Sequence, residues 1–156
     1  MINSIYTNKV SEHVGQEIIV QGFAQTLRVQ SKIIFLVLRD VNGTLQTVIE
    51  ASNAEAFSVA SCLSHESVVR IWGVVKEMPQ APGGAEVNVS KIEVLSVASP
   101  ELPIPVVVKG SNEESEAPVR FDHRWIDIRK PEKTKIFKVW TELEKACEEG
   151  RLVNGI

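Results

Sequence analysis

Five side chains near the start of the chain have the chemistry of a nucleic-acid contact. They are one aromatic residue, one amide and three cations: Phe35, Gln46, Arg28, Lys32 and Arg39. An aromatic ring can stack on a base, an amide can hydrogen-bond the edge of that base, and cations can neutralise phosphates. Stacking contributes roughly 1–3 kcal/mol per base, so even a single exposed phenylalanine matters. The pattern predicts a contact with single-stranded nucleic acid if the fold brings these residues to one face.

Strand alternation decides which face these side chains occupy. Residues 32–39 and 44–50 read as two strands, and the Asn42-Gly43 dipeptide between them is a strong hairpin signal. The aliphatic residues on one face of the first strand would fill a core: Ile34, Leu36 and Leu38. Phe35 would then stand on the outer face, and Gln46 would join it there because it alternates with apolar neighbours.

A second interpretation of the same residues stays open. Phe35 could instead pack beneath a following segment, and Gln46 could simply be solvated. Arg39 precedes Asp40 directly, which favours a local ion pair at the strand end. Residue types and spacing alone do not choose between this structural role and the binding role.

The elements that must position these residues are those of a small β-barrel. Five runs rich in Val, Ile and Leu predict strands over residues 17–28, 32–39, 44–50, 67–76 and 85–96. An alanine-rich helix is predicted over residues 52–64, capped by Ser52 or Asn53. Three strands, a helix and two strands is the order of a mainly β, five-stranded Greek-key OB-fold barrel. An SH3-like barrel is the competing fold, and the intervening helix and the long first strand count against it.

The predicted organisation has three parts. Residues 1–99 form the barrel, the Pro-rich and acidic residues 100–130 form a linker or hinge region, and residues 131–156 form an amphipathic helix. We expect this helix to end near Gly150. Its apolar stripe is expected to support self-association or contact with a further domain through four residues: Ile136, Val139, Trp140 and Leu143.

Composition narrows the class of protein. The chain has 156 residues and a formal net charge of −3, so no bulk positive field would attract nucleic acid indiscriminately. Cys62 and Cys147 are expected to be buried thiols, and no spacing of histidines and cysteines predicts a metal site. The absence of a signal peptide or membrane-length apolar run favours a cytoplasmic protein with no membrane partner.

An ordered set of motifs resembles a known family. The string Lys32 to Asp40 (KIIFLVLRD) with Gln46 is similar to the anticodon-binding domain of aspartyl-tRNA synthetases, and asparaginyl-tRNA synthetases share most of it. The resemblance continues through the segment Leu102 to Pro105 (LPIP) and ends in His123 to Arg129 (HRWIDIR). It therefore covers nearly the whole chain in order.

The resemblance implies a role for each matching residue. Phe35 would stack on the central uridine of the anticodon, Gln46 would hydrogen-bond that base, and Arg28 would contact the anticodon loop. The resemblance assigns no role to Lys32 and Arg39, which are expected from their position in the sheet to neutralise phosphates as nearby cations. The implied partner is the aspartate tRNA, or the asparagine tRNA as well, because the central uridine is common to both anticodons.

The family's catalytic motifs are not present in this sequence. The segment after the predicted helix start departs from the family pattern at Glu148, Gly150 and Arg151, and we find no Gly-rich phosphate loop. We therefore expect a tRNA-binding module without aminoacylation activity of its own and without a cofactor, since ATP and magnesium belong to a complete synthetase. The alternative function is a protein-interaction or assembly module that uses the stripe of the C-terminal helix.

Overall fold

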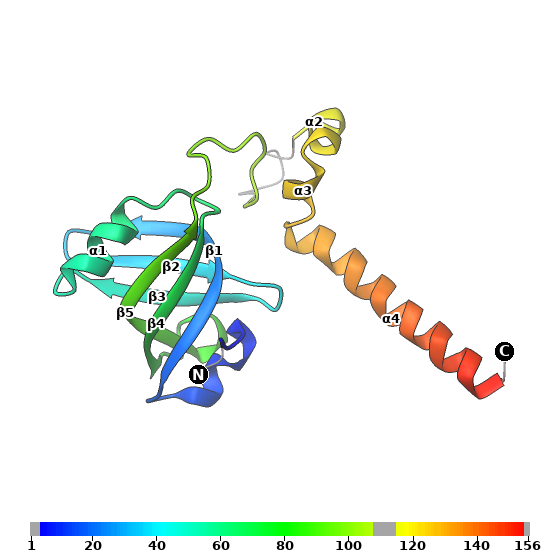
Figure 1. Ribbon diagram of the computed structural model, residues 1–156, viewed down its shortest axis with the longest axis horizontal. Coiled ribbons are helices and arrows are strands. Elements are labelled where there is room, and N and C mark those ends of the chain that lie inside the picture. The colour runs from blue at the N-terminus through cyan, green and yellow to red at the C-terminus, as the bar shows by residue number, and fades with distance from the viewer. Residues whose placement is uncertain (1–3, 108–114, 155–156) are drawn as a thin grey trace. The chain divides into compact units, whose positions relative to one another are not determined.

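Five strands close into a single barrel. In the computed structural model, which describes residues 4–107 and 115–154, the strands are β1 (Glu17–Val29), β2 (Ile33–Arg39), β3 (Thr44–Glu50), β4 (Val68–Glu77) and β5 (Ala85–Ser96). Their order around the barrel is β1-β2-β3-β5-β4 (Figure 1). All neighbours are antiparallel except β3 and β5, which run parallel. The predicted mainly β OB-fold barrel, with a helix after the third strand, is confirmed.

The barrel interior is filled by one face of each strand. The predicted core residues of β2 are completely buried: Ile34, Leu36 and Leu38. Leu45 and Ile49 of β3 join them, as do Ile71 of β4 and Val87 of β5. Because successive strand residues alternate between faces, burying this set places the intervening residues on the outside of the barrel.

The first strand is long because it pairs with two neighbours. Its first half, residues 17–23, pairs with β4, and its second half pairs with β2. A register shift between Ala24 and Thr26 marks the place where it bends. Gly22 lies just before this bend, and a Cβ there would collide with the backbone oxygen of Arg39. Glycine at this position is therefore required for the close approach of β1 and β2.

Short helices lie in the connections between the strands and before the first strand. The helix α1 (Ala54–Ser61) follows β3, while the 3-10 segments η1 (Thr7–His13) and η2 (Pro82–Gly84) precede β1 and β5. Asn53 is the N-cap of α1, because its side-chain oxygen accepts a hydrogen bond from the Ala56 amide. The predicted burial of Cys62 is wrong: this residue is the C-cap of α1, where the chain leaves the helix, and it is exposed.

The residues after the barrel form a second compact unit. The chain divides into residues 1–100 and 101–156, and the second unit contains α2 (Ala117–Asp122), α3 (Arg124–Asp127) and α4 (Pro131–Asn154). Its small core consists of Ile104, Val106 and Ile126. The predicted linker thus ends in two short helices that the sequence pattern did not indicate.

Helix α4 is longer than expected. It continues through Gly150 to Asn154, so the predicted end near Gly150 is wrong. A glycine costs a helix interior only about 1 kcal/mol relative to alanine, which is too little to end a helix by itself. Cys147 also lies exposed on this helix rather than buried.

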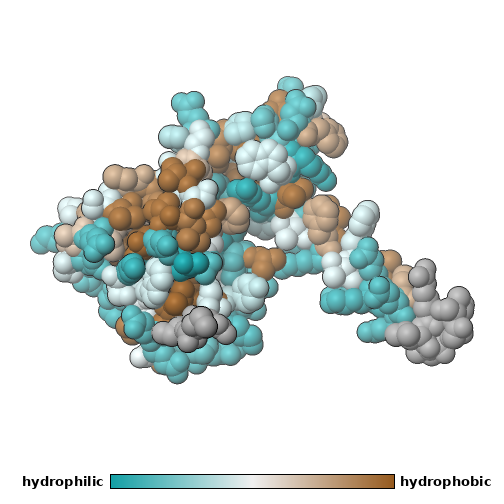
Figure 2. All heavy atoms as spheres, viewed as in Figure 1, coloured by the Kyte–Doolittle hydropathy of each residue, from teal (hydrophilic) through white to brown (hydrophobic). Residues whose placement is uncertain are grey.

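Apolar side chains remain on the surface of both units. On α4 the predicted stripe is exposed, with Trp140 at 65% and Leu143 at 61%. On the barrel, Leu95 and Val97 are also exposed, and Figure 2 shows hydrophobic side chains gathered on one visible face of this unit. Within the described residues, no helix is both long and apolar enough to cross a membrane.

Candidate nucleic-acid interface

Four outward side chains lie in one row across the barrel. Arg28 of β1 pairs with Phe35 of β2, Phe35 pairs with Val48 of β3, and Val48 pairs with Asn88 of β5. Cross-strand partners point to the same side of a sheet. Phe35 is half-buried and Val48 is buried, so together they form the apolar centre of the row. We call this row, together with the row described next, the β2–β3 face.

A second row runs alongside the first. Thr26, Val37, Gln46 and Glu86 are partners on β1, β2, β3 and β5. Gln46 is therefore the diagonal neighbour of Phe35, two residues along β3 from Val48. The predicted outward position of Phe35 and Gln46 on one face agrees with this register. Sequence alternation was sufficient to find it, because a one-residue slip would have exposed the whole core set.

Glu86 controls the orientation of the Gln46 amide. The Gln46 Nε2 atom donates a hydrogen bond to Glu86 Oε2 at 3.0 Å, and Glu86 is only 8% exposed. A carboxylate only accepts hydrogen bonds, so the amide nitrogen must face it and the Gln46 Oε1 oxygen must point elsewhere. The face therefore presents the Gln46 Oε1 as a hydrogen-bond acceptor beside the Phe35 ring, while the second N–H of Nε2 remains a donor.

Cations border this face on one side. Arg28 lies at the far end of the first row and is exposed. Lys32 is also exposed and lies in the turn between β1 and β2. An aromatic platform with an amide and flanking cations can hold an unstacked base and the phosphates next to it.

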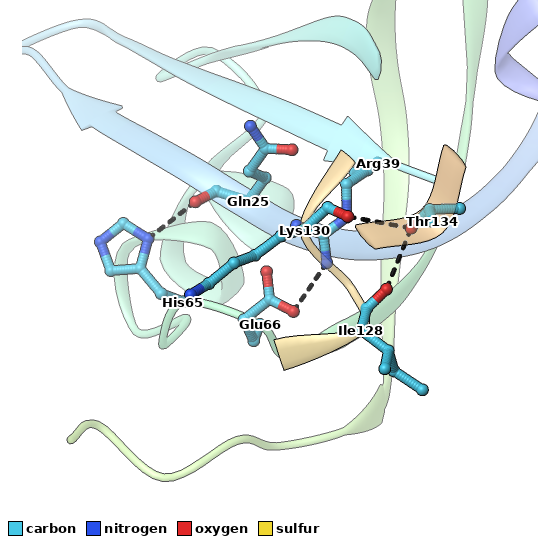
Figure 3. A network of polar contacts seen from close by, with 7 residues as sticks. All are labelled: Gln25, Arg39, His65, Glu66, Ile128, Lys130 and Thr134. Carbon is cyan, nitrogen blue, oxygen red and sulfur yellow. Dashed lines mark hydrogen bonds and ion pairs between the residues drawn. The ribbon is translucent and has the colours of Figure 1, made fainter. Parts of the chain in front are cut away.

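Arg39 occupies a different environment from the other predicted cations. Its guanidinium Nη2 atom donates to Glu66 Oε2 at 2.8 Å, and the two side chains are only 9% and 3% exposed (Figure 3). The expected local pair with Asp40 is wrong, because Asp40 instead accepts hydrogen bonds from the backbone nitrogen and the hydroxyl of Thr7. Strand alternation points Asp40 away from Arg39, while the loop before β4 brings Glu66 to it.

Other contacts drawn in Figure 3 are structural. The His65 ring lies 3.0 Å from the backbone oxygen of Gln25, next to the loop that carries Glu66. Within the second unit, the Thr134 hydroxyl donates to the backbone oxygens of Ile128 and Lys130, which fastens the first turn of α4. Among the residues that the structure describes, no group of three histidines, cysteines or carboxylates is placed to hold a metal ion.

Sequence reasoning missed three features of the barrel surface. It did not find Glu86 as the partner of Gln46, nor the pair Asn88 and Glu50 beside Val48. It also missed Trp72 on β4, whose ring lies 5.0 Å from the Lys91 ammonium and 5.9 Å from the Arg70 guanidinium carbon. The β3–β5 pairing would have revealed the first two, but a parallel pair between distant strands leaves no local sequence signal.

Comparisons with known proteins agree with this geometry. The family described as OB-fold nucleic acid binding domain matches residues 18–95. The asparagine–tRNA ligase of Pyrococcus furiosus is 37% identical over 99% of this chain, and the aspartate–tRNA(Asp/Asn) ligase of Methanococcus maripaludis is 35% identical over 86% of it. This chain covers 35% and 30% of those proteins, so it spans about a third of the relatives it matches.

A solved structure extends the likeness to the whole chain. The asparaginyl-tRNA synthetase from Pyrococcus horikoshii matches 99% of this chain with a TM-score of 0.87 and 36% sequence identity, and 36% of that synthetase is covered. Three observations support the same assignment to a nucleic-acid-binding OB-fold. They are the order of strands in the barrel, the outward aromatic and amide side chains, and these relatives. Nearly the whole chain is thus similar to one part of asparaginyl- and aspartyl-tRNA ligases. Through residues 18–95, the chain belongs to the family of OB-fold nucleic acid binding domains.

Proposed function

We propose that the β2–β3 face binds the anticodon loop of a tRNA whose central anticodon base is uridine. Phe35 stacks on that base, and Gln46 hydrogen-bonds its edge. Arg28 and Lys32 hold the neighbouring phosphates. The buried ion pair with Glu66 gives Arg39 a structural role, so it is not part of this proposed site.

The observation that carries the proposal is the orientation of Gln46. One N–H of its Nε2 is engaged by Glu86, which holds the amide in one orientation and leaves Oε1 as its acceptor for a base beside Phe35. Uracil carries an N–H donor at position 3 of its Watson–Crick edge, whereas cytosine has an acceptor at the same position. An acceptor fixed on the protein therefore favours uridine and repels cytidine.

The proposed partner is the aspartate tRNA, the asparagine tRNA or both, because both anticodons have uridine at the centre. Two relatives support this range: one is named for asparagine and the other for tRNA(Asp/Asn). Since this chain spans about a third of such proteins, we propose that it contributes recognition to tRNA aminoacylation, and that ATP and magnesium are used by a catalytic domain rather than by this unit. We also propose that it works in the cytoplasm.

The test is a binding titration of the 156-residue chain with two anticodon stem-loops that differ only at the central base. We expect the uridine loop to bind more tightly than the cytidine loop at two salt concentrations. Phe35→Ala should lower the affinity for the uridine loop by about 1–3 kcal/mol, because stacking is lost. Trp72→Ala, which removes an outward aromatic residue of β4, is the matched control and should leave the affinity unchanged.

Two results would contradict the proposal. Equal affinity for the two loops would mean that Gln46 does not read the central base. Unchanged binding by Phe35→Ala would mean that the ring does not stack, even if the loop binds elsewhere on the barrel.

We further propose that the exposed stripe of α4 mediates self-association of this chain. Ile136, Trp140 and Leu143 follow steps of four and three residues and are all more than half exposed, which is the spacing of a helix–helix seam. Sedimentation velocity should show a dimer, and Trp140→Glu should give a monomer that still binds the uridine loop. A monomeric native chain at micromolar concentration would contradict this proposal.

A further inference from the structure

The hairpin loop between β2 and β3 carries a chemically reactive dipeptide that the proposed function does not use. Asn42 and Gly43 are both exposed, and they lie in the loop that follows Arg39, the last residue of β2. Asparagine is a thermally labile residue. Its side-chain amide can be attacked by the backbone nitrogen of the next residue, and when that residue is glycine no Cβ hinders the approach. The Asn42-Gly43 dipeptide is therefore a candidate site of spontaneous deamidation.

Deamidation is a substitution at the Asn42 side chain that needs only water and a solvent base. The base removes the proton from the Gly43 backbone nitrogen, and this nitrogen attacks Asn42 Cγ. The bond between Cγ and the side-chain nitrogen breaks, and that nitrogen takes up a proton from water and leaves as ammonia. Water then opens the cyclic imide at either of its carbonyl carbons, which yields aspartate or isoaspartate. The rate depends on how easily the Gly43 N–H loses its proton and how freely its nitrogen moves.

One carboxylate holds both backbone nitrogens of this dipeptide. Asp40 Oδ1 accepts hydrogen bonds from the Asn42 nitrogen at 2.7 Å and from the Gly43 nitrogen at 3.1 Å. The Asp40 nitrogen in turn donates to the Gly43 carbonyl oxygen at 3.0 Å. These bonds fix the backbone on both sides of the reacting atoms, so the Gly43 nitrogen is not free to turn toward Asn42 Cγ. The carboxylate also opposes loss of the Gly43 proton, because that loss would place a second negative charge beside it.

Asp40 is itself held in place by the segment before β1. Thr7 donates to it twice, from the backbone nitrogen to Oδ2 and from the hydroxyl to Oδ1, and both distances are 2.7 Å. Thr7 is buried and Asp40 is half-buried. The carboxylate is thus fixed against the loop, while the Asn42 side chain beside it is open to water.

We propose that Asn42 is a deamidation site and that the Asp40 carboxylate slows its reaction in the folded chain. The product places a new carboxylate beside Asp40, and isoaspartate also lengthens the backbone of the loop. Both changes weaken the hydrogen bonds that join the loop to Asp40. The loop connects the two strands that carry Phe35 and Gln46, so the modification loosens one end of their ladder. This inference goes beyond the proposed function and does not depend on it.

The test compares the rate of deamidation in the folded chain and in the chain unfolded by guanidinium chloride. Residues 41–43 and 153–155 are the same tripeptide, Val-Asn-Gly, so Asn42 and Asn154 should react at comparable rates in the unfolded chain. In the folded chain we expect Asn42 to react about tenfold more slowly than in the unfolded chain, which is the fold-change given by one hydrogen bond to a charged group. Peptide mapping by mass spectrometry, after incubation at one pH and temperature, measures these rates.

Three variants separate the effect of the carboxylate from that of the fold. Asp40→Ala removes both hydrogen bonds to the loop and should abolish most of the difference between the folded and unfolded rates. Asp40→Asn should raise the folded rate less, because its amide oxygen still accepts hydrogen bonds but carries no charge. Thr7→Ala is the matched control: it removes one bond to Asp40 but leaves Asp40 bonded to the loop, so it should keep the slow rate. Circular dichroism establishes that each variant is folded, and if Asp40→Ala is not, Asp40→Asn decides.

Four results would overturn the inference. No reaction at Asn42 in the unfolded chain would mean that it is not a deamidation site. Equal rates in the folded and unfolded chains would mean that the loop is not protected. A native rate in the folded Asp40→Asn variant would mean that the charge of Asp40 does not slow the reaction. A rate in Thr7→Ala as fast as in Asp40→Ala would mean that the segment before β1, and not the bonds from Asp40 to the loop, controls the reaction.

Discussion

Two arginine–aromatic pairs connect β1 to β2, one near each end of their ladder, and they have different environments. Arg28 lies opposite Phe35 at one end, and Phe23 lies opposite Arg39 at the other. Both pairs point outward from the barrel, since they alternate with the buried residues of β2. The same two residue types in the same cross-strand arrangement therefore form two different pairs. We call Arg28–Phe35, whose arginine is exposed, the open pair, and Phe23–Arg39, whose arginine is buried, the closed pair.

A carboxylate from a distant segment makes the difference. The Arg39 guanidinium lies 5.3 Å from the centre of the Phe23 ring and forms a buried ion pair with Glu66, which is 27 residues away in sequence. Arg28 is exposed to solvent. An arginine in a buried pair cannot bind a phosphate without leaving a buried charge uncompensated, whereas an exposed arginine can. The local sequence specifies the pair, and tertiary contacts decide whether it is structural or available for binding.

The largest effect should come from breaking the closed pair. We expect Arg39→Ala to lower the free energy of unfolding by about 3–5 kcal/mol, because the buried Glu66 carboxylate loses its ion pair with Arg39. Urea denaturation followed by circular dichroism measures this change. Arg28→Ala is the control at the open pair and should change the free energy of unfolding by no more than about 0.5 kcal/mol.

A second variant keeps this prediction specific to the ion pair. The double variant Arg39→Met with Glu66→Gln removes both charges and should recover part of the lost stability, since the buried carboxylate charge is removed together with the arginine that offset it. If Arg39→Ala unfolds at the same urea concentration as the native chain, the closed pair contributes nothing to stability and the contrast with Arg28 fails.

The fold was predictable to a large extent because its signals are local. Alternation in β2 identified the core residues and the outward Phe35, and Asn42-Gly43 identified the hairpin. Helix boundaries were less predictable: α1 is shorter than its alanine-rich segment, and α4 passes through Gly150. In both cases the sequence signal at the helix end was a single weak preference that other interactions could override.

The candidate site was predictable only in part. Phe35, Gln46 and Arg28 could be placed on one face because they lie on neighbouring antiparallel strands. The partner of Arg39 could not be found, because it comes from the loop after α1 and local sequence favoured the adjacent Asp40. The contribution of β5 was invisible for a related reason: its parallel pairing with β3 spans a helix and a strand.

The smallest effect should come from the open pair. It is a change in how RNA-binding affinity depends on salt concentration, and not a change in stability. Each phosphate contact to a single strand steepens the dependence of log affinity on log salt by about 0.7. Arg28→Gln should therefore make the slope shallower by about that amount for stem-loops with either central base, because a phosphate contact carries no sequence information. Titrations of the native chain and the variant across a range of salt concentrations measure this slope. Lys9→Gln is the control, since Lys9 is already paired to Glu12 in η1.

An unchanged slope would mean that Arg28 does not contact the RNA backbone. A slope change confined to the uridine loop would instead mean that Arg28 acts through the base stacked on Phe35. Either result would mean that Arg28, like Arg39, makes no sequence-independent phosphate contact. The two pairs would then differ only in burial.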